Sequence, residues 1–426
     1  MKKAFTYLCL IALGSANAAL AEDAPKIKVL GAKTSVTKSS AITKVAPAAI
    51  APLYPVALPF EFPNAKAAFE ETKKLLLQNY YSTSINEEAL YWAAIKGMLR
   101  QVSPPENREH SKILLPIQGA AIDQMLNGKS TSYGLSLSFD PSDGSLTVTD
   151  VAPESSADGL ILLNDRIMQI NKQTFVGKKI EDVNKLLEGK VGDKINLTVV
   201  RGIKVLEVAL TRKEFSVHSL NVYRLPNQVA LIEIHRVTHS AANELKDALV
   251  GLEKDGYAKK VIFDLRGNGG GVSSEGVDMA DLFLKANELV MIVRTKNPKV
   301  DRVMTKDDSE LNGKYAVLVN KQTASSSEVF VSALKSYGKA KIFGSNTYGK
   351  GIIDRDFNLS NKFRVLFPTG VMYSPKGVSW QTLGITPDVA VVQDLKVYGE
   401  LSKIEPEKRL SNDAPLKAAF DYLKGL

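Results

Sequence analysis

The stretch AVLVNKQTASSSEVFVSALKSYGKAKIFG, residues 316–344, decides the fold. An apolar run (AVLV) leads through a polar loop into a segment with helical spacing, and a second apolar run (AKIFG) follows. This order predicts a strand, a helix and a strand, the repeating unit of a sheet covered by helices. Similar runs (VALIEIH, KKVIFDL) alternate with helical stretches from residue 213 to 395, so we expect one α/β core there.

Ser325 falls where the polar loop enters the predicted helix. With Glu328 it forms the S-x-x-E pattern of a capping box, in which the serine hydroxyl accepts from a first-turn amide. The same position suits a nucleophile, because free amides and the helix dipole stabilise an oxyanion that forms beside it. From the residues alone, both a helix cap and a nucleophile remain open.

A serine nucleophile needs a base. The chain has four histidines and no G-x-S-x-G segment, which argues against Ser-His-Asp chemistry. A serine activated by a neutral lysine is the remaining class, and NTYGKG places Lys350 between two glycines just beyond the strand AKIFG. An exposed lysine in a turn is the alternative interpretation.

The segment DLRGNGGG, residues 264–271, follows the predicted strand KKVIFDL. Its glycines allow backbone conformations and close approach that other residues cannot adopt. The loop therefore either aims backbone amides at a developing anion or makes a tight strand-to-helix turn.

In their order and spacing, DLRGNGGG, TASSSE, TYGKG, YSPKGVSW and GITPDV resemble the carboxyl-terminal processing (tail-specific) serine peptidases. The resemblance implies that Ser325 is the nucleophile and Lys350 the general base. It also implies that Gly270 or Gly271 forms the oxyanion hole together with the amide of Ser326. It implies no metal or organic cofactor.

Two positions of the core depart from that family. Asp354 stands where members usually carry a glutamine that orients the lysine amine. A carboxylate there favours the ammonium form of Lys350, the wrong direction for a base. Either Asp354 points away, or it is protonated, or the enzyme is weak or inactive. Gly269 replaces a common proline, which loosens the loop around the oxyanion hole.

Residues 131–212 are predicted to form a compact, mostly β domain, and the resemblance extends to it. YGLSL looks like the carboxylate-binding loop of a PDZ domain, with Tyr133 and Gly134 in the loop and Leu135 and Leu137 lining an apolar pocket. A PDZ domain binds a free chain terminus by strand addition. The implied partners are therefore the C-termini of unfolded or partly unfolded proteins.

The PDZ signature also shows departures. Asn164 and Lys172 stand where glycines are usual. Asparagine tolerates a left-handed turn, whereas lysine is less comfortable there.

The first 21 residues contain two lysines, a short apolar run and small residues suited to cleavage, which predicts a secretory signal peptide. Cys9, the only cysteine, lies inside it, so we expect a mature chain without disulfides or a cysteine nucleophile. The expected location is periplasmic or secreted. Residues 22–62 read as a linker, residues 63–130 as a helical domain, and residues 396–426 as a helical tail.

The predicted fold class is multidomain α/β, with an N-terminal helical region, a PDZ-like β domain, and an α/β Ser-Lys peptidase core with a C-terminal helix. The predicted function is an exported serine endopeptidase that recognises free protein C-termini. A catalytically silent PDZ regulator, disabled by Asp354, is the alternative. The formal net charge is +9, but the sequence has no block of five or six like charges. We therefore predict no nucleic-acid partner. The sequence leaves open an adaptor lipoprotein and a homo-oligomer.

Overall fold

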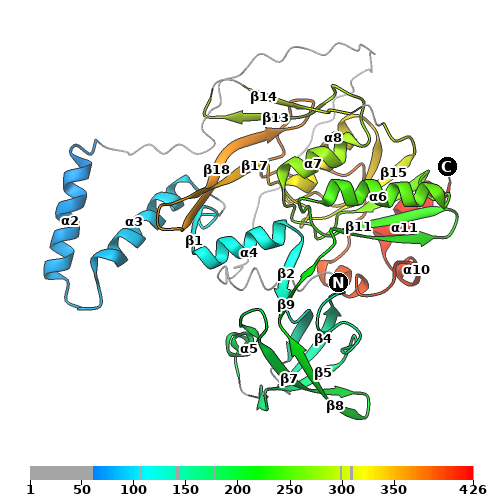
Figure 1. Ribbon diagram of the computed structural model, residues 1–426. Coiled ribbons are helices and arrows are strands. Elements are labelled where there is room, and N and C mark those ends of the chain that lie inside the picture. The colour runs from blue at the N-terminus through cyan, green and yellow to red at the C-terminus, as the bar shows by residue number, and fades with distance from the viewer. Residues whose placement is uncertain are drawn as a thin grey trace, which may run out of the picture. The chain divides into compact units, whose positions relative to one another are not determined.

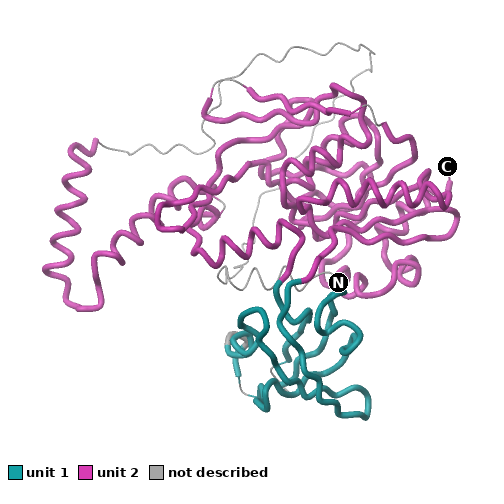
Figure 2. Tube along the Cα trace, viewed as in Figure 1, with its two compact units in different colours: residues 1–48, 131–214 teal, residues 49–130, 215–426 magenta. Residues whose placement is uncertain are grey.

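The computed structural model describes residues 61–105, 107–140, 144–176, 178–297, 300–307 and 310–425. The predicted signal peptide, and the predicted linker up to residue 60, lie outside these residues. The chain divides into two compact units, one containing residues 131–214 and the other residues 61–130 together with 215–425 (Figure 2). The predicted multidomain α/β class is confirmed.

The larger unit is built on a six-stranded sheet in the order β10-β11-β12-β15-β16-β19. Its strands from β11 to β19 run parallel, and β10 joins the edge antiparallel to β11. The bounds are β10 (Leu220–Leu225), β11 (Val229–Ile234), β12 (Lys260–Asp264), β15 (Lys314–Val319), β16 (Ala340–Gly344) and β19 (Val389–Ala390).

Helices cover both faces of this sheet because alternate residues of its strands point to opposite sides. Phe263 and Val317 pack with three helices, α6 (Ala241–Lys254), α7 (Ser273–Asp281) and α8 (Ser326–Ser336), seen together in Figure 1. Ile262 and Leu318, one position along, pack instead against α11 (Ala414–Lys424). The core is therefore a three-layer α/β/α stack.

A second, antiparallel sheet of the same unit is organised by one long strand, β18 (Arg364–Tyr373). Along one edge β18 pairs with β17 (Ile352–Asn358), and along the other it pairs with β1 (Lys112–Leu114) and β13 (Leu289–Thr295). β14 (Asp301–Met304) pairs with β13. Strand β18 thus brings a segment near residue 110 close to the chain that follows Lys350.

The N-terminal part of this unit is helical, as expected. Its elements are α2 (Ala65–Asn79), α3 (Glu87–Val102) and α4 (Pro116–Leu126). No residue of α2 is buried, and Leu99 is the buried residue of α3. Within the described part of the chain, no helix has the length and apolar character needed to cross a membrane.

The smaller unit is a mostly β fold with the strand order β3-β4-β5-β7-β8, in which β3 is an edge strand. Leu146, Ile167 and Leu197 are among its fully buried core residues. The bounds are β3 (Leu135–Asp140), β4 (Ser145–Val151), β5 (Arg166–Ile170), β6 (Gln173–Thr174), α5 (Ile180–Leu187), β7 (Lys194–Arg201) and β8 (Lys204–Thr211). Strands β2 (Lys129–Ser132) and β9 (Lys213–Ser216) pair with each other.

The C-terminal tail joins the core through buried ion pairs. It contains α9 (Leu395–Leu401), α10 (Pro406–Arg409) and α11. The guanidinium of Arg266 donates to Asp264 at 2.7 Å and to Asp413, just before α11, at 2.7 and 2.8 Å. Arg409 pairs with Glu233. Burial would raise the pKa of Asp264, but the charges of Arg266 and Arg409 hold it below its usual value.

Removing one carboxylate from this network should destabilise the core strongly. We expect Asp413→Ala to lower the free energy of unfolding by about 3–5 kcal/mol, because Arg266 and Arg409 stay buried without their shared partner. Urea denaturation followed by tryptophan fluorescence measures the change.

A matched control lies on α11. Asp421 pairs with Lys417 but is half exposed, so Asp421→Ala should cost about 0.5 kcal/mol or less. Equal effects of the two substitutions would contradict a structural role for the buried network.

Candidate active site

Three loops that the sequence singled out meet at one edge of the core sheet. DLRGNGGG follows β12, TASSSE lies beyond β15, and TYGKG lies beyond β16. These three strands are adjacent and parallel, so their carboxyl ends lie together. This edge is where α/β sheets place their functional sites.

Ser325 has an unusual backbone at the start of α8. Its φ and ψ are 58° and −124°, a conformation that strains a residue with a side chain and that is found preferentially at functional sites. Its N–H donates to Glu328 Oε2 at 2.9 Å, but its hydroxyl makes no capping hydrogen bond. Only half of the predicted capping box is formed, which leaves the hydroxyl available for chemistry.

The buried carboxylate of Glu328 joins the serine loop to the lysine loop. Its Oε2 accepts from the amides of Ser325 (2.9 Å) and Lys350 (2.8 Å). Its Oε1 accepts from the amide of Gly349 (2.8 Å) and the hydroxyl of Thr347 (2.5 Å). Burial raises the pKa of Glu328, although these four donors oppose the shift. One side chain therefore fixes the relative positions of two backbones.

Further contacts hold the lysine loop from its other side. The indole N–H of Trp380 donates to the carbonyl of Lys350 at 3.3 Å, and Gln381 accepts from the amide of Gly351 at 2.7 Å. The amide of Ile385 donates to the Thr347 hydroxyl at 2.6 Å. The segments YSPKGVSW and GITPDV thus act structurally, by supporting the loop that carries Lys350.

The glycine loop lies directly against the serine. A methyl group added to Gly270, where φ is 89°, would lie 2.9 Å from Ser325 Cβ and 3.0 Å from the nitrogen of Ser326. The amide of Gly270 itself donates to Asn268 Oδ1 at 2.9 Å. Within the described residues, no hydrogen bond is recorded for the amides of Gly271 and Ser326. These two amides are therefore the better pair of candidate oxyanion donors.

Gly269, the predicted loose point of this loop, has open space around it. No atom lies within 4 Å of the position that a side chain would take. The loop is held just before this glycine, because the side-chain amide of Asn268 donates to the carbonyl of Ile234 and its backbone carbonyl accepts from the amide of Ala324, both at 3.0 Å.

Asp354 faces Lys350 directly. Its Oδ2 lies 2.8 Å from Lys350 Nζ, and its side chain is 10% exposed. Burial would raise the pKa of Asp354, but a hydrogen bond from His110 and the charge of Lys350 hold it below its usual value. Asp354 neither points away nor is protonated at neutral pH. Two of the three explanations offered for this residue are therefore wrong.

His110 completes this cluster and was missed in the sequence. Its Nε2 lies 2.8 Å from Asp354 Oδ1, and the two residues are 244 positions apart. The sequence around His110 contains no motif that indicates a role in the site. Only the pairing of β1 and β17 with opposite edges of β18 brings the two side chains together.

In the smaller unit, the predicted peptide-binding residues lie in and before strand β3. Gly134 has a φ of 86°, and a methyl group added to it would lie 1.9 Å from the Ser155 hydroxyl. Leu135 and Leu137 are half-buried against the core. Tyr133 is only 3% exposed and belongs to the core itself. The loop therefore needs glycine at 134, whereas Tyr133 has a structural position.

Both residues that replace glycine in the PDZ signature adopt left-handed backbones. The φ angles of Asn164 and Lys172 are 68° and 64°. Lysine in this region costs roughly 1–2 kcal/mol relative to glycine. Both positions therefore adopt the backbone that glycine favours, with some strain at Lys172.

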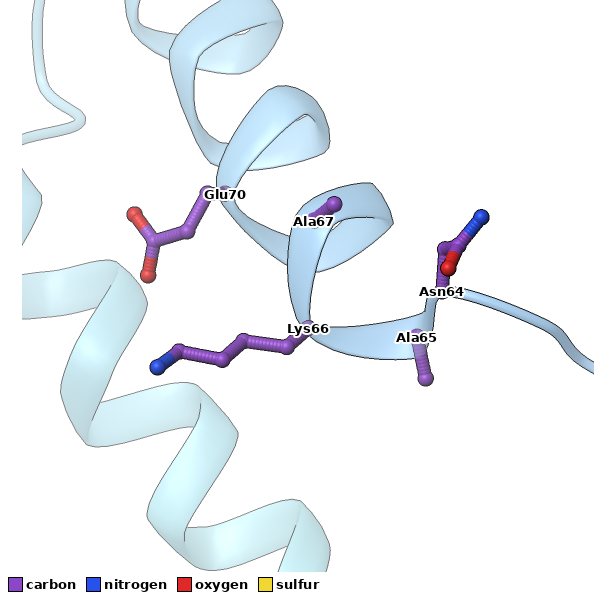
Figure 3. A pocket seen from close by; sticks show the side chains of 5 residues that line it. All are labelled: Asn64, Ala65, Lys66, Ala67 and Glu70. Atoms are coloured by element: carbon purple, nitrogen blue, oxygen red, sulfur yellow. The ribbon is translucent and has the colours of Figure 1, made fainter.

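A hollow elsewhere on the larger unit is unrelated to these residues. It lies at the beginning of α2 and is lined by Asn64, Ala65, Lys66, Ala67 and Glu70 (Figure 3). No residue of the Ser325 cluster lines it.

Comparison with known proteins agrees with this geometry. The profile of peptidase family S41 matches residues 228–391, and that of the PDZ domain matches residues 134–211. A "Probable CtpA-like serine protease" of Staphylococcus aureus (strain MRSA252) is 31% identical over 343 residues, covering 80% of this chain and 67% of the relative. The chain belongs to peptidase family S41. It is a serine peptidase of the CtpA-like type, with a PDZ domain.

A second curated relative of this S41 peptidase, from Staphylococcus saprophyticus, is 29% identical over the same share of each chain. Among solved structures, an S41 protease from Bacteroides fragilis NCTC 9343 superposes with a TM-score of 0.56. Its sequence identity is 16%, and the match covers 87% of this chain and 99% of the other. This structural likeness supports the fold.

Loss of the Glu328 charge should disconnect the two loops. The amide group of Glu328→Gln offers one accepting oxygen in place of two, so some of the four buried donors lose their partner. Displacement of reacting groups by about 1 Å costs roughly a hundredfold in rate, and we expect kcat/KM to fall by at least that much. Steady-state peptidase assays measure it.

Glu400→Gln is the matched control, because that carboxylate is 75% exposed on α9. It should leave kcat/KM unchanged. Wild-type kcat/KM in the Glu328→Gln variant would show that the shared carboxylate does not position the site.

Proposed function

We propose that this S41 peptidase is an exported endopeptidase that binds the free C-terminus of an unfolded or partly unfolded protein and cleaves the chain with a Ser-Lys site. The observation that carries the proposal is the Glu328 oxygen shared by the amides of Ser325 and Lys350. It ties the candidate nucleophile and the candidate base to one buried point.

In the proposed reaction, neutral Lys350 takes the hydroxyl proton of Ser325, and the serine oxygen attacks the peptide carbonyl. The amides of Gly271 and Ser326 are the proposed donors to the oxyanion. The C–N bond then breaks as the leaving amine takes that proton from the Lys350 ammonium, which leaves Lys350 neutral again. Water hydrolyses the acyl-enzyme ester and releases the shortened protein.

Strand addition at β3 is the proposed mode of substrate capture. β3 is the edge strand of its sheet, so its outer side can pair with an extended peptide. Leu135 and Leu137, half-buried on this strand, are proposed to contact an apolar terminal side chain. Export is proposed from the predicted signal peptide in residues 1–21.

The alternative function, a peptide-binding regulator without activity, is favoured by one contact. Lys350 is paired with Asp354 at 2.8 Å, and an ammonium cannot act as a base. The two functions share the PDZ domain and differ in whether Lys350 becomes neutral during turnover.

An assay with paired substrates tests the proposal. The mature protein and its Ser325→Ala variant are incubated with an unstructured polypeptide that ends in apolar residues, made with a free C-terminal carboxylate or with an amide. Fragments are followed by mass spectrometry. We expect serine-dependent cleavage of the substrate with a free C-terminal carboxylate. For the amidated substrate we expect kcat/KM to be lower by about tenfold or more, because the amide cannot accept charge-assisted hydrogen bonds.

Circular dichroism should show that Ser325→Ala is folded. Cleavage that survives in this variant would end the Ser-Lys proposal. Serine-dependent cleavage that ignores amidation would end C-terminal recognition but not catalysis. An intact substrate that nevertheless binds would establish the silent peptide-binder.

A further inference from the structure

The cluster around Lys350 contains more basic groups than one carboxylate can neutralise. Asp354 lies between Lys350 Nζ and His110 Nε2, at 2.8 Å from each. The side chains of Lys350 and His110 are 29% and 16% exposed. Lys112 is a third basic group near this cluster. Burial lowers the pKa of Lys112, the charge of Lys350 lowers it further, and the charge of Asp354 acts in the opposite direction. Two basic side chains thus contact one carboxylate, and a third lies within its electrostatic influence.

The strand register explains why these groups converge. Lys112 on β1 pairs with Leu366 of β18, and His110 lies two residues before Lys112, just outside the strand. On the other edge of β18, Asp354 of β17 pairs with Pro368. β1 and β17 thus lie on opposite edges of β18, and the side chains of His110 and Asp354 meet there. Lys350 enters from the loop before β17.

The ionised state of Asp354 fixes the role of His110. An ionised carboxylate only accepts hydrogen bonds, so Nε2 of His110 must carry the proton and donate to Oδ1. This bond withdraws negative charge from the carboxylate, whose other oxygen holds Lys350.

We propose that His110 is a positioning residue of the peptidase: it binds the second oxygen of Asp354 and weakens the hold of that carboxylate on the Lys350 ammonium. Lys350 then releases one proton to solvent and becomes the neutral amine, while Asp354 stays ionised and remains paired with His110. This assignment rests on the proposed role of Lys350. It explains how an S41 peptidase works with a carboxylate where its family usually has an uncharged amide.

The pH profile of kcat/KM tests the assignment, since a merely structural role would lower activity without moving the profile. His110→Phe keeps a ring but removes the donor. We expect its acidic limb to move to higher pH by about one unit, which is about a tenfold loss on that limb. His110→Gln retains a neutral donor at a similar reach, so its limb should return toward the wild-type position.

The Asp354→Gln background tests whether His110 acts on Lys350 through the carboxylate of Asp354. Asp354→Gln alone should move the acidic limb to lower pH, because the ammonium loses its anionic partner. His110→Phe added to Asp354→Gln should then leave the limb in place. His218→Gln is the control, since that side chain is 59% exposed and lies in the loop between β9 and β10, and it should leave the profile unchanged.

An unmoved limb in His110→Phe, or the same shift in the Asp354→Gln background, would overturn the assignment. If His110→Phe does not fold, His110→Asn, whose amide is too short to reach Asp354 Oδ1, takes its place. Lys350→Ala separates the two hypotheses. Activity in that variant means that the Ser-Lys proposal has failed, whereas its inactivity together with an unmoved limb in His110→Phe means that only the role of His110 has failed.

Discussion

The buried carboxylate of Glu328 is the constraint around which the site is organised. Two of its four donors are the amides of Ser325 and Lys350, which lie on loops after different strands. A buried carboxylate without donors would be costly, and buried amides without an acceptor would be costly too. The buried amides of both loops therefore donate to the same buried carboxylate, and this requirement fixes the relative positions of the Ser325 and Lys350 backbones.

The core sheet makes that arrangement possible. Parallel neighbours β12, β15 and β16 end at the same edge, so three motifs separated by tens of residues meet without a long loop. Buried ion pairs of Arg266 with Asp264 and with Asp413, just before α11, anchor the glycine loop DLRGNGGG to the C-terminal tail. The C-terminal tail is thus part of the support for the glycine loop, as well as a cover for the sheet.

The second sheet adds the element that distinguishes this peptidase. Strand β18 pairs on one edge with β17, which contains Asp354, and on the other with β1, which follows His110 by two residues. His110 and Lys350 therefore compete for one carboxylate beside the candidate base. In a partly buried site such competition matters, because the lower dielectric strengthens both attraction and repulsion. The charge state of Lys350 is consequently a property of the whole cluster and cannot be assigned from its own position in the chain.

The sequence by itself determined the α/β class, the PDZ domain and the family, because strand and helix periodicity and the glycine loops are local properties that the chain records in order. Ser325 at a helix start and Lys350 in the next loop were predictable for the same reason. The direction of Asp354, the participation of His110 and the occupied amide of Gly270 were decided only by the tertiary structure. These depend on side-chain orientation and on strand register across β18, which join residues 244 positions apart and leave no periodic trace in the sequence.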